Sequence, residues 1–261
     1  MVCCLGMVIA TQAYGHPVDT AQQSAFPLWL ERVPLAFFWS AYIWGSVRVW
    51  PGWGKAALFH SGGLLAAAAL IGPLDRLAES NAAAHMIQHM LMMVAIAPLW
   101  VLAQPLPQLA NAARWITGLW TPLLRLARYP VAAAVVHGLV IWFWHAPRLY
   151  ILALENPWWH LVEHASFLLT AGIFWWAVLR SSRRAGPAAL LALLFTLMHT
   201  GFLGALLSFA SGSLYGEGRD LLSQQLAGLT MWVVGGIPYL VAALWTGSRW
   251  FQQITHSSNN A

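Results

Sequence analysis

The chain has 261 residues, of which 59% are hydrophobic and only 8% are charged, and it contains 17 tryptophans. Soluble domains carry about 25% charged residues, so this composition excludes an ordinary soluble protein and indicates a polytopic membrane protein. The net charge of +5 does not indicate nucleic-acid binding, because the basic residues are few and scattered in the way that membrane topology explains.

The first 15 residues form an apolar start that fits two interpretations, a signal peptide or an extra N-terminal helix. Residues 1–15 hold both cysteines of the chain, Cys3 and Cys4. If this start is removed, the remaining protein has no thiol and forms neither a disulfide nor a thiolate metal site. We expect residues 16–250 to form a single transmembrane bundle domain and residues 251–261 to form a polar cytoplasmic tail.

Seven apolar segments follow, and each is predicted to cross the membrane as a helix. A span needs roughly 20 apolar residues, and lipid offers no partners to unpaired backbone groups. The predicted spans are residues 33–49, 56–72, 84–103, 130–146, 160–180, 187–209 and 224–246. Residues 104–129 are amphipathic and bounded by prolines, so we expect them to lie along the membrane surface. The predicted fold class is an all-α, polytopic membrane helical bundle of about seven transmembrane helices.

Basic residues are divided unevenly between the two sides of this predicted bundle. Nine of the 13 fall on the side that holds the loops after spans one, three and five and the C-terminal tail: Arg48, Lys55, Arg114, Arg125, Arg128, Arg180, Arg183, Arg184 and Arg249. The positive-inside rule makes this side cytoplasmic, so the N-terminus lies outside and the C-terminus lies in the cytoplasm. Because Lys55 is the only lysine and lies in a loop, a retinal Schiff base within the bundle is excluded.

This orientation brings five histidines to one depth near the outer face. The third span enters the membrane from outside, so His85 and His89 lie in its first two turns. The fifth span enters in the same direction and places His160 and His164 in the same way. His145 lies at the outer end of the fourth span. Ionisable side chains at membrane depth indicate a functional site.

The spacing of these histidines predicts a metal site. Each pair has i,i+4 spacing, so its two rings share one helix face. Imidazole suits copper, zinc, iron and nickel, and the thioether of Met93, one turn deeper, favours Cu(I). The predicted metal ligands are His85, His89, His145, His160, His164 and Met93, with copper as the expected ion. Glu163 either orients a ligand ring or binds the metal directly. The alternative is that the histidines only form hydrogen bonds between helices.

Other functional interpretations remain open at this point. His137 and His199 lie nearer the middle of the membrane and could hold a haem axially, which makes a haem-binding redox membrane protein an alternative. A copper transport or tolerance protein is another alternative, although the cytoplasmic half is poor in methionine and histidine. The stretch HLVEH has the order of an inverted zinc-protease motif, but no soluble catalytic domain surrounds it. A protease is therefore not expected. Because the exchange of a metal between histidine and methionine ligands requires no catalysis, we do not expect an enzyme.

Several sequence blocks resemble those of a known family. These blocks are HMIQHMLMMVAIAPLWVLAQP, WFWHAPRLY, HLVEHASFLLTAGIFWWAVL and QQLAGLTMWVVGG. They resemble signatures of the CtaG family of integral-membrane cytochrome c oxidase assembly factors, over roughly residues 30–246. The resemblance implies a multi-pass protein of the bacterial plasma (inner) membrane that helps haem–copper oxidase to acquire copper. It also implies an oxidase subunit as partner, and we expect a periplasmic copper donor as well. The five outer histidines carry over, whereas Ser223 stands where family members often have aspartate.

Overall fold

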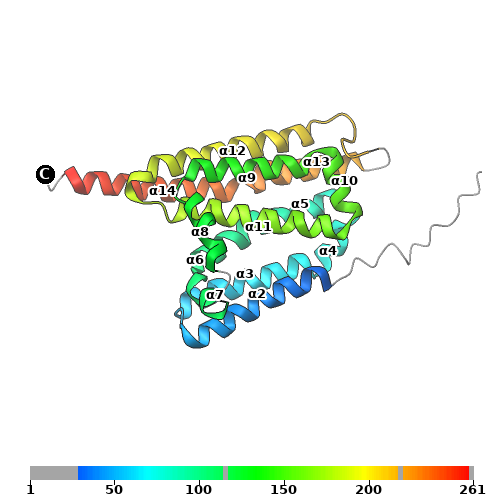
Figure 1. Cartoon of the computed structure of the whole chain (residues 1–261). Coiled ribbons are helices and arrows are strands. Elements are labelled where there is room, and N and C mark those ends of the chain that lie inside the picture. Colours follow the sequence, from blue (N-terminus) through cyan, green and yellow to red (C-terminus); the bar gives the residue numbers. More distant parts are fainter. Residues whose placement is uncertain (1–28, 114–116, 217–219, 259–261) are drawn as a thin grey trace, which may run out of the picture.

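Helices are the regular secondary structure of the part of the chain that the structure describes, which confirms the predicted all-α fold. The computed structural model describes residues 29–113, 117–216 and 220–258. Its long helices lie side by side along roughly one common direction (Figure 1). The predicted signal peptide or extra helix at residues 1–15 lies outside the described residues.

The first two long helices, α2 (Trp29–Arg48) and α3 (Trp53–Leu70), form one side of the bundle (Figure 1). Gly52 lies in the turn between them with a φ of 87°, a left-handed conformation that glycine adopts at little cost. A short helix, α4 (Pro73–Ala78), follows α3 and begins with proline, a residue favoured in a first helical turn.

The predicted third span is one continuous helical segment of 22 residues, Ala82–Ala103. It consists of α5 (Ala82–Met90), the π-helical segment η1 (Leu91–Ile96) and α6 (Ala97–Ala103). Pro98 lacks an amide proton and disturbs a regular helix. The wider turns of η1 precede Pro98, and the helix continues beyond this proline.

The predicted surface segment at 104–129 forms two short helices, α7 (Leu106–Ala112) and α8 (Thr117–Leu126). Helix α9 (Pro130–His145) follows, and it is bent by 108° relative to the preceding helical turns of α8. The polypeptide therefore turns sharply before it re-enters the bundle.

Helix α11 (Pro157–Leu179) lies at the centre of the packing, since it contacts α9, α6 and η1. The short helix α10 (Pro147–Glu155) leads into it. A single 3-10 turn, η3 (Arg183–Ala185), then precedes the long apolar helix α12 (Gly186–Ser208). The central place of α11 is what brings its histidines against other helices.

The last span consists of α13 (Leu221–Leu229), the π-helical segment η4 (Thr230–Val234) and α14 (Gly236–Ser258). Helix α14 extends well beyond the predicted end of this span at residue 246 and includes most of the predicted tail. A Cβ added at Gly228 would lie 2.5 Å from the carbonyl oxygen of Gly204. Glycine at this position allows α12 and α13 to approach backbone to backbone.

Four helical segments among the described residues are long and apolar enough to cross a membrane, and a fifth is added if the bent pair α8–α9 counts as one span. The chain therefore has the features of a multi-pass membrane protein, while the predicted count of seven is not confirmed. Helices do occur over all seven predicted ranges. Helices α2 and α3 are less apolar because they carry charged residues such as Arg48 and Lys55, and α9 has only 16 residues.

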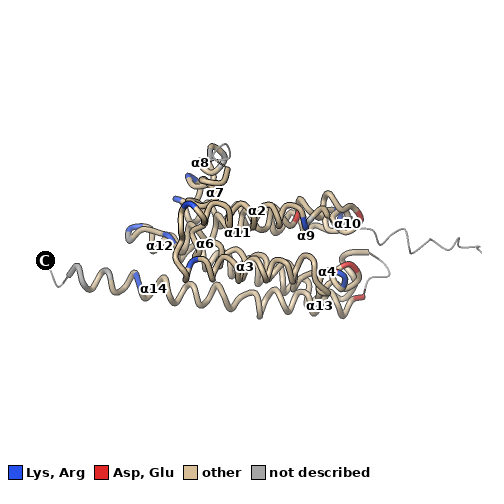
Figure 2. The backbone as a smooth tube through the Cα atoms, turned by 90° about the horizontal axis from the view of Figure 1, so that it is seen from below, with Lys and Arg blue, Asp and Glu red and all other residues tan. Residues whose placement is uncertain are grey.

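Charged residues separate along the length of the bundle (Figure 2). Most lysines and arginines gather at the end formed by α7, α8 and the start of α12, whereas aspartates and glutamates gather near α4, α10 and α13. This separation agrees with the division of charges expected from the sequence. It gives the two ends of the molecule opposite electrostatic character.

Candidate metal centre

Two asparagines begin the helices that carry the paired histidines. The Oδ1 atom of Asn81 accepts a hydrogen bond from the amide of Ala84 at 2.9 Å, and Asn156 Oδ1 accepts one from the amide of Trp158 at 2.9 Å. Asparagine is favoured here because its oxygen satisfies an amide that has no partner within the helix. In both helices the histidines follow the asparagine by four and eight residues. The two pairs therefore lie equally far from their helix starts.

Four imidazoles from α5 and α11 meet in the space between these two helices. The ring centroids are 4.1 Å apart between His85 and His89, and 4.0 Å apart between His160 and His164. Between the helices, they are 5.6 Å apart for His85 and His160 and 5.3 Å apart for His89 and His164. We call these four residues, together with Glu163, the histidine cluster.

The carboxylate of Glu163 is shared by both histidine pairs. Its Oε2 atom lies 3.9 Å from His85 Nε2 and 3.8 Å from His89 Nε2. With His160 and His164 it forms a second group whose candidate ligand atoms all lie within 4.8 Å of one another. Ligand atoms about 2.0–2.1 Å from one tetrahedral ion are roughly 3.3 Å apart. Small side-chain rotations would bring these groups to that separation, so the residues fit a bound metal ion.

The histidine cluster is buried. His85, His89 and Glu163 are each only 1% exposed. The ring of Phe167 lies 4.8 Å from that of His89, and the ring of Tyr150 lies 5.6 Å from that of His85. Neither ring nitrogen of His89 has a hydrogen-bond partner among the described residues. Burying a polar group without a partner costs free energy, and a bound ion would offset that cost.

The two other predicted ligands, His145 and Met93, have different surroundings. His145 Nδ1 donates to the carbonyl oxygen of Ile141 at 2.8 Å, and this leaves Nε2 without a hydrogen-bond partner among the described residues. Its ring centroid lies 6.4 Å from that of Phe167, the ring that also packs against His89. Met93 is fully buried in the apolar core, and its carbonyl oxygen accepts a 2.7 Å hydrogen bond from Trp175 Nε1.

A serine from the last span fixes the start of α5. The hydroxyl of Ser223 accepts a hydrogen bond from the amide of Ala83 at 3.2 Å and donates to Asn81 Oδ1 at 3.1 Å. Ser223 thus satisfies another amide at the helix start and orients the capping side chain. This contact positions His85 and His89 relative to α13. Serine provides it at the position where the family resemblance leads us to expect aspartate.

Two stacked tyrosines pack beside the cluster. The rings of Tyr150 and Tyr215 have centroids 3.9 Å apart, and Tyr215 Oη lies 3.5 Å from the carbonyl oxygen of His145. Burial raises the pKa of Tyr215, and Tyr150 and Glu163 raise it further. The hydroxyl therefore stays protonated and can donate. Gln224 Oε1 accepts a 2.8 Å hydrogen bond from the amide of the residue preceding Tyr215, which holds this loop in place.

His137 and His199, the residues considered for haem, form a separate pair. His137 Nδ1 lies 2.9 Å from Thr170 Oγ1, and that hydroxyl donates to the carbonyl oxygen of Ser166 at 2.8 Å. The hydroxyl therefore accepts from His137 Nδ1. His199 packs against Gly138, where an added Cβ would lie only 2.9 Å from His199 Nε2. This close contact leaves no space for a haem plane at that nitrogen.

The family model described as cytochrome c oxidase caa3 assembly factor (Caa3_CtaG) matches residues 36–253. The chain belongs to this family. The match confirms the resemblance seen in the sequence, and it includes the whole histidine cluster together with His145 and Ser223. No curated protein and no solved structure matches the chain.

Sequence reasoning about this Caa3_CtaG member identified both histidine pairs and Glu163, and the structure brings all of them together. It did not identify Tyr150 or Tyr215, because only the packing of α10 and of the loop after α12 brings them near the cluster. For the two asparagine caps, by contrast, the sequence does carry a signal at the helix starts. The pattern of asparagine, three residues, histidine, three residues and histidine occurs twice, at 81–89 and at 156–164.

Proposed function

We propose that the histidine cluster binds copper and holds it as cargo during the assembly of cytochrome c oxidase. The observation that carries this proposal is the meeting of four imidazoles and one carboxylate, all buried, between α5 and α11. Membership of a cytochrome c oxidase assembly factor family supports the assembly role. Cytochrome c oxidase is a haem–copper enzyme, so an assembly factor with a metal-binding cluster suits the delivery of its copper.

The proposed ligands are His85, His89, His145, His160, His164 and Met93, with Glu163 as a further ligand or a partner of the imidazoles. Nitrogen ligands suit both oxidation states of copper, and a thioether favours Cu(I). The carboxylate of Glu163 would offset the positive charge of a copper ion in surroundings of low polarity. Transfer of the ion requires only an exchange of ligands, so the proposal assigns no enzymatic activity.

We further propose that the N-terminus lies outside and the C-terminus lies in the cytoplasm, with seven crossings that include α2 and α3. The proposed location is the bacterial plasma membrane, with residues 16–250 as one bundle domain and residues 251–261 as the cytoplasmic tail. Most basic residues lie at the end of the bundle formed by α7, α8 and the start of α12, and this excess supports a cytoplasmic location for that end. The cluster then lies near the outer face, where a periplasmic copper donor and an oxidase subunit have access.

The experiment that tests the proposal is metal analysis of the purified full-length protein after loading with Cu(I). The double variant His85→Ala/His89→Ala removes one helix's share of the ligands and should lose most of the bound copper. His60→Ala is the matched control, because His60 lies on α3 and accepts a 2.9 Å hydrogen bond from Trp39. The control should retain the wild-type copper content, whereas equal copper in all three proteins would refute the site.

Two other functions predict different results with the same samples. A haem-binding redox protein would show a Soret absorption band that shifts on reduction, and the contact between His199 and Gly138 argues against it. A copper transport protein would move copper across the membrane of a proteoliposome. The proposed assembly factor should show neither property, and it should transfer copper to an oxidase copper-binding domain.

A further inference from the structure

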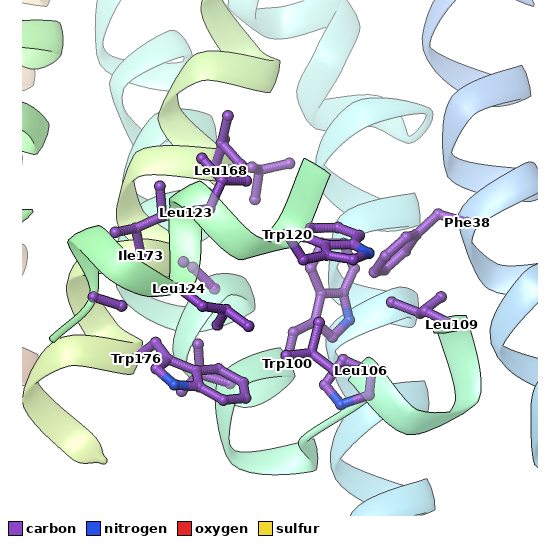
Figure 3. A pocket seen from close by; sticks show the side chains of 16 residues that line it. Phe38, Trp100, Leu106, Leu109, Trp120, Leu123, Leu124, Leu168, Ile173 and Trp176 are labelled. Carbon is purple, nitrogen blue, oxygen red and sulfur yellow. The ribbon is translucent and has the colours of Figure 1, made fainter. Parts of the chain in front are cut away.

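An apolar cavity lies near the ends of α6 and α11, whereas the histidine cluster lies near the starts of α5 and α11. This partly open cavity of about 280 Å³ is lined by residues of α2, α6, α7, α8 and α11. Its walls include Phe38, Trp100, Trp120, Leu124, Gly172 and Trp176. Figure 3 shows Leu123, Leu124 and Trp120 on α8 closing it from one side, with Trp100 and Trp176 around it. Almost no polar surface lines the cavity, so the group that occupies it must be apolar.

The size of the cavity distinguishes two apolar occupants, a helix of a partner protein and an acyl chain of a lipid. An α-helix about 10–12 Å across, rising 1.5 Å per residue, fills roughly 120 Å³ or more per residue. The cavity has the volume of about two residues of a helix, so a partner helix could enter it only with one or two side chains. A methylene group fills roughly the 30 Å³ of a water molecule, so the cavity holds about nine methylenes of a lipid chain. That is a substantial part of one acyl chain, which spans half of the roughly 30 Å hydrocarbon core.

The charges around the cavity point to the headgroup that such a lipid would carry. Arg125 and Arg128 are exposed and lie next to the lining residues of α8. Lys55 Nζ donates a 3.0 Å hydrogen bond to Gln104, which directly precedes a proline that lines the cavity. The sequence contains no acidic residue between Glu79 and Glu155. This surface attracts an anion at the membrane interface.

We propose that the cavity is a binding site for an anionic phospholipid, with one acyl chain between α8 and α11 and its phosphate near Arg125 and Arg128. The bound chain fills the space that the 108° bend between α8 and α9 leaves behind α8. The lipid thereby attaches α8 to the bundle. This site is independent of the copper proposal, because none of its lining residues belongs to the histidine cluster.

Native mass spectrometry of the full-length protein tests this site, with dioleoyl phosphatidylglycerol and dioleoyl phosphatidylcholine as probes. Gly172→Leu fills the cavity from α11, where an added Cβ meets no atom within 4 Å, and should abolish binding of either lipid. Gly54→Leu is the matched control, because a Cβ there also meets no atom within 4 Å and Gly54 lies outside the cavity. It should bind as the wild type does.

The headgroup is tested with Arg125→Gln/Arg128→Gln. Each arginine near an anionic headgroup contributes about a 5-fold preference, so the double variant should lose about 25-fold of the preference for phosphatidylglycerol. Equal retention of lipid by wild type and Gly172→Leu would overturn the proposal. Equal affinity of the wild type for both lipids would also overturn it. The same holds if a protein copurifies in place of a lipid and Gly172→Leu displaces that protein. Thermal unfolding of each variant shows that loss of lipid does not reflect loss of fold.

Discussion

The two ends of the paired segments α5–α6 and α11 differ in their chemistry. Near their starts, both present histidines to each other around the carboxylate of Glu163. Near their ends, the same segments contribute Trp100, Gly172 and Trp176 to a cavity with almost no polar surface. Both places are where α11 packs against the third span, yet one could hold an ion and the other a hydrocarbon chain.

This difference shows how a membrane bundle keeps polar groups in place. At the histidine end, the capping side chain of Asn156 and the hydroxyl of Ser223 from α13 satisfy the helix starts and fix the ring positions. At the cavity end, large aromatic rings provide contact area and no ligand atoms. A substitution at one end should therefore leave the property of the other end unchanged, and the following predictions test that separation.

The largest effect is expected for Trp100→Ala at the cavity end. Trp100 packs on Phe38 with ring centroids 4.8 Å apart and donates a 3.2 Å hydrogen bond to the carbonyl oxygen of Phe59. Trp100 is half-buried, so its truncation should cost about 3 kcal/mol of unfolding free energy, the lower end of the range for core tryptophans. Denaturant unfolding in detergent should show this loss, while the copper content of the folded protein stays at the wild-type level. A parallel loss of copper would show that the two ends are coupled.

Glu163→Ala should produce the next largest effect, at the other end. Loss of the shared carboxylate should weaken copper binding about 100-fold, and Glu163→Gln, which keeps the shape, about 10-fold. Competition with a Cu(I) chelator measures both affinities. Lipid binding at the cavity serves as the internal control and should not change. An unchanged copper affinity in Glu163→Ala would remove Glu163 from the site.

A smaller effect is expected for Ser223→Ala, which breaks the contacts with Ala83 and Asn81. Loss of a capping hydroxyl costs about 1 kcal/mol, so the unfolding free energy should fall by that amount and copper affinity should fall severalfold. Ser223→Asp should restore much of the affinity, because a carboxylate also accepts a hydrogen bond from a helix-start amide. If alanine and aspartate behave alike, Ser223 does not position α5.

The smallest effect is expected for Tyr215→Phe. Among the described residues, the hydroxyl of Tyr215 makes one long hydrogen bond of 3.5 Å, whereas its ring stacks on Tyr150. Removing the hydroxyl alone should change the unfolding free energy by about 0.5 kcal/mol, and Tyr215→Ala should cost more because it removes the stack as well. Thermal unfolding distinguishes the two. An equal loss in both variants would assign the effect to the hydroxyl.

The sequence was informative where the signal is local. The i,i+4 histidine pairs and the apolar ranges predicted both helices of the cluster, and the third span was predicted at 84–103 and observed at Ala82–Ala103. The extension of α14 to Ser258 and the 108° bend before α9 were not predicted. Both features lie in polar or proline-bounded segments, where the hydropathy of the sequence does not mark the residue at which a helix ends. The contacts of Tyr215 and Ser223 join residues more than 60 positions apart, and no spacing rule connects them.

The central claim is that the imidazoles of α5 and α11 bind copper together. X-ray absorption at the copper edge of the Cu(I)-loaded protein tests it most directly. We predict a first shell dominated by nitrogen, with the outer-shell scattering of at least two imidazole rings, and a changed spectrum when either His85/His89 or His160/His164 are replaced by alanine. A spectrum that stays the same in both double variants would show that copper binds elsewhere and would contradict the claim.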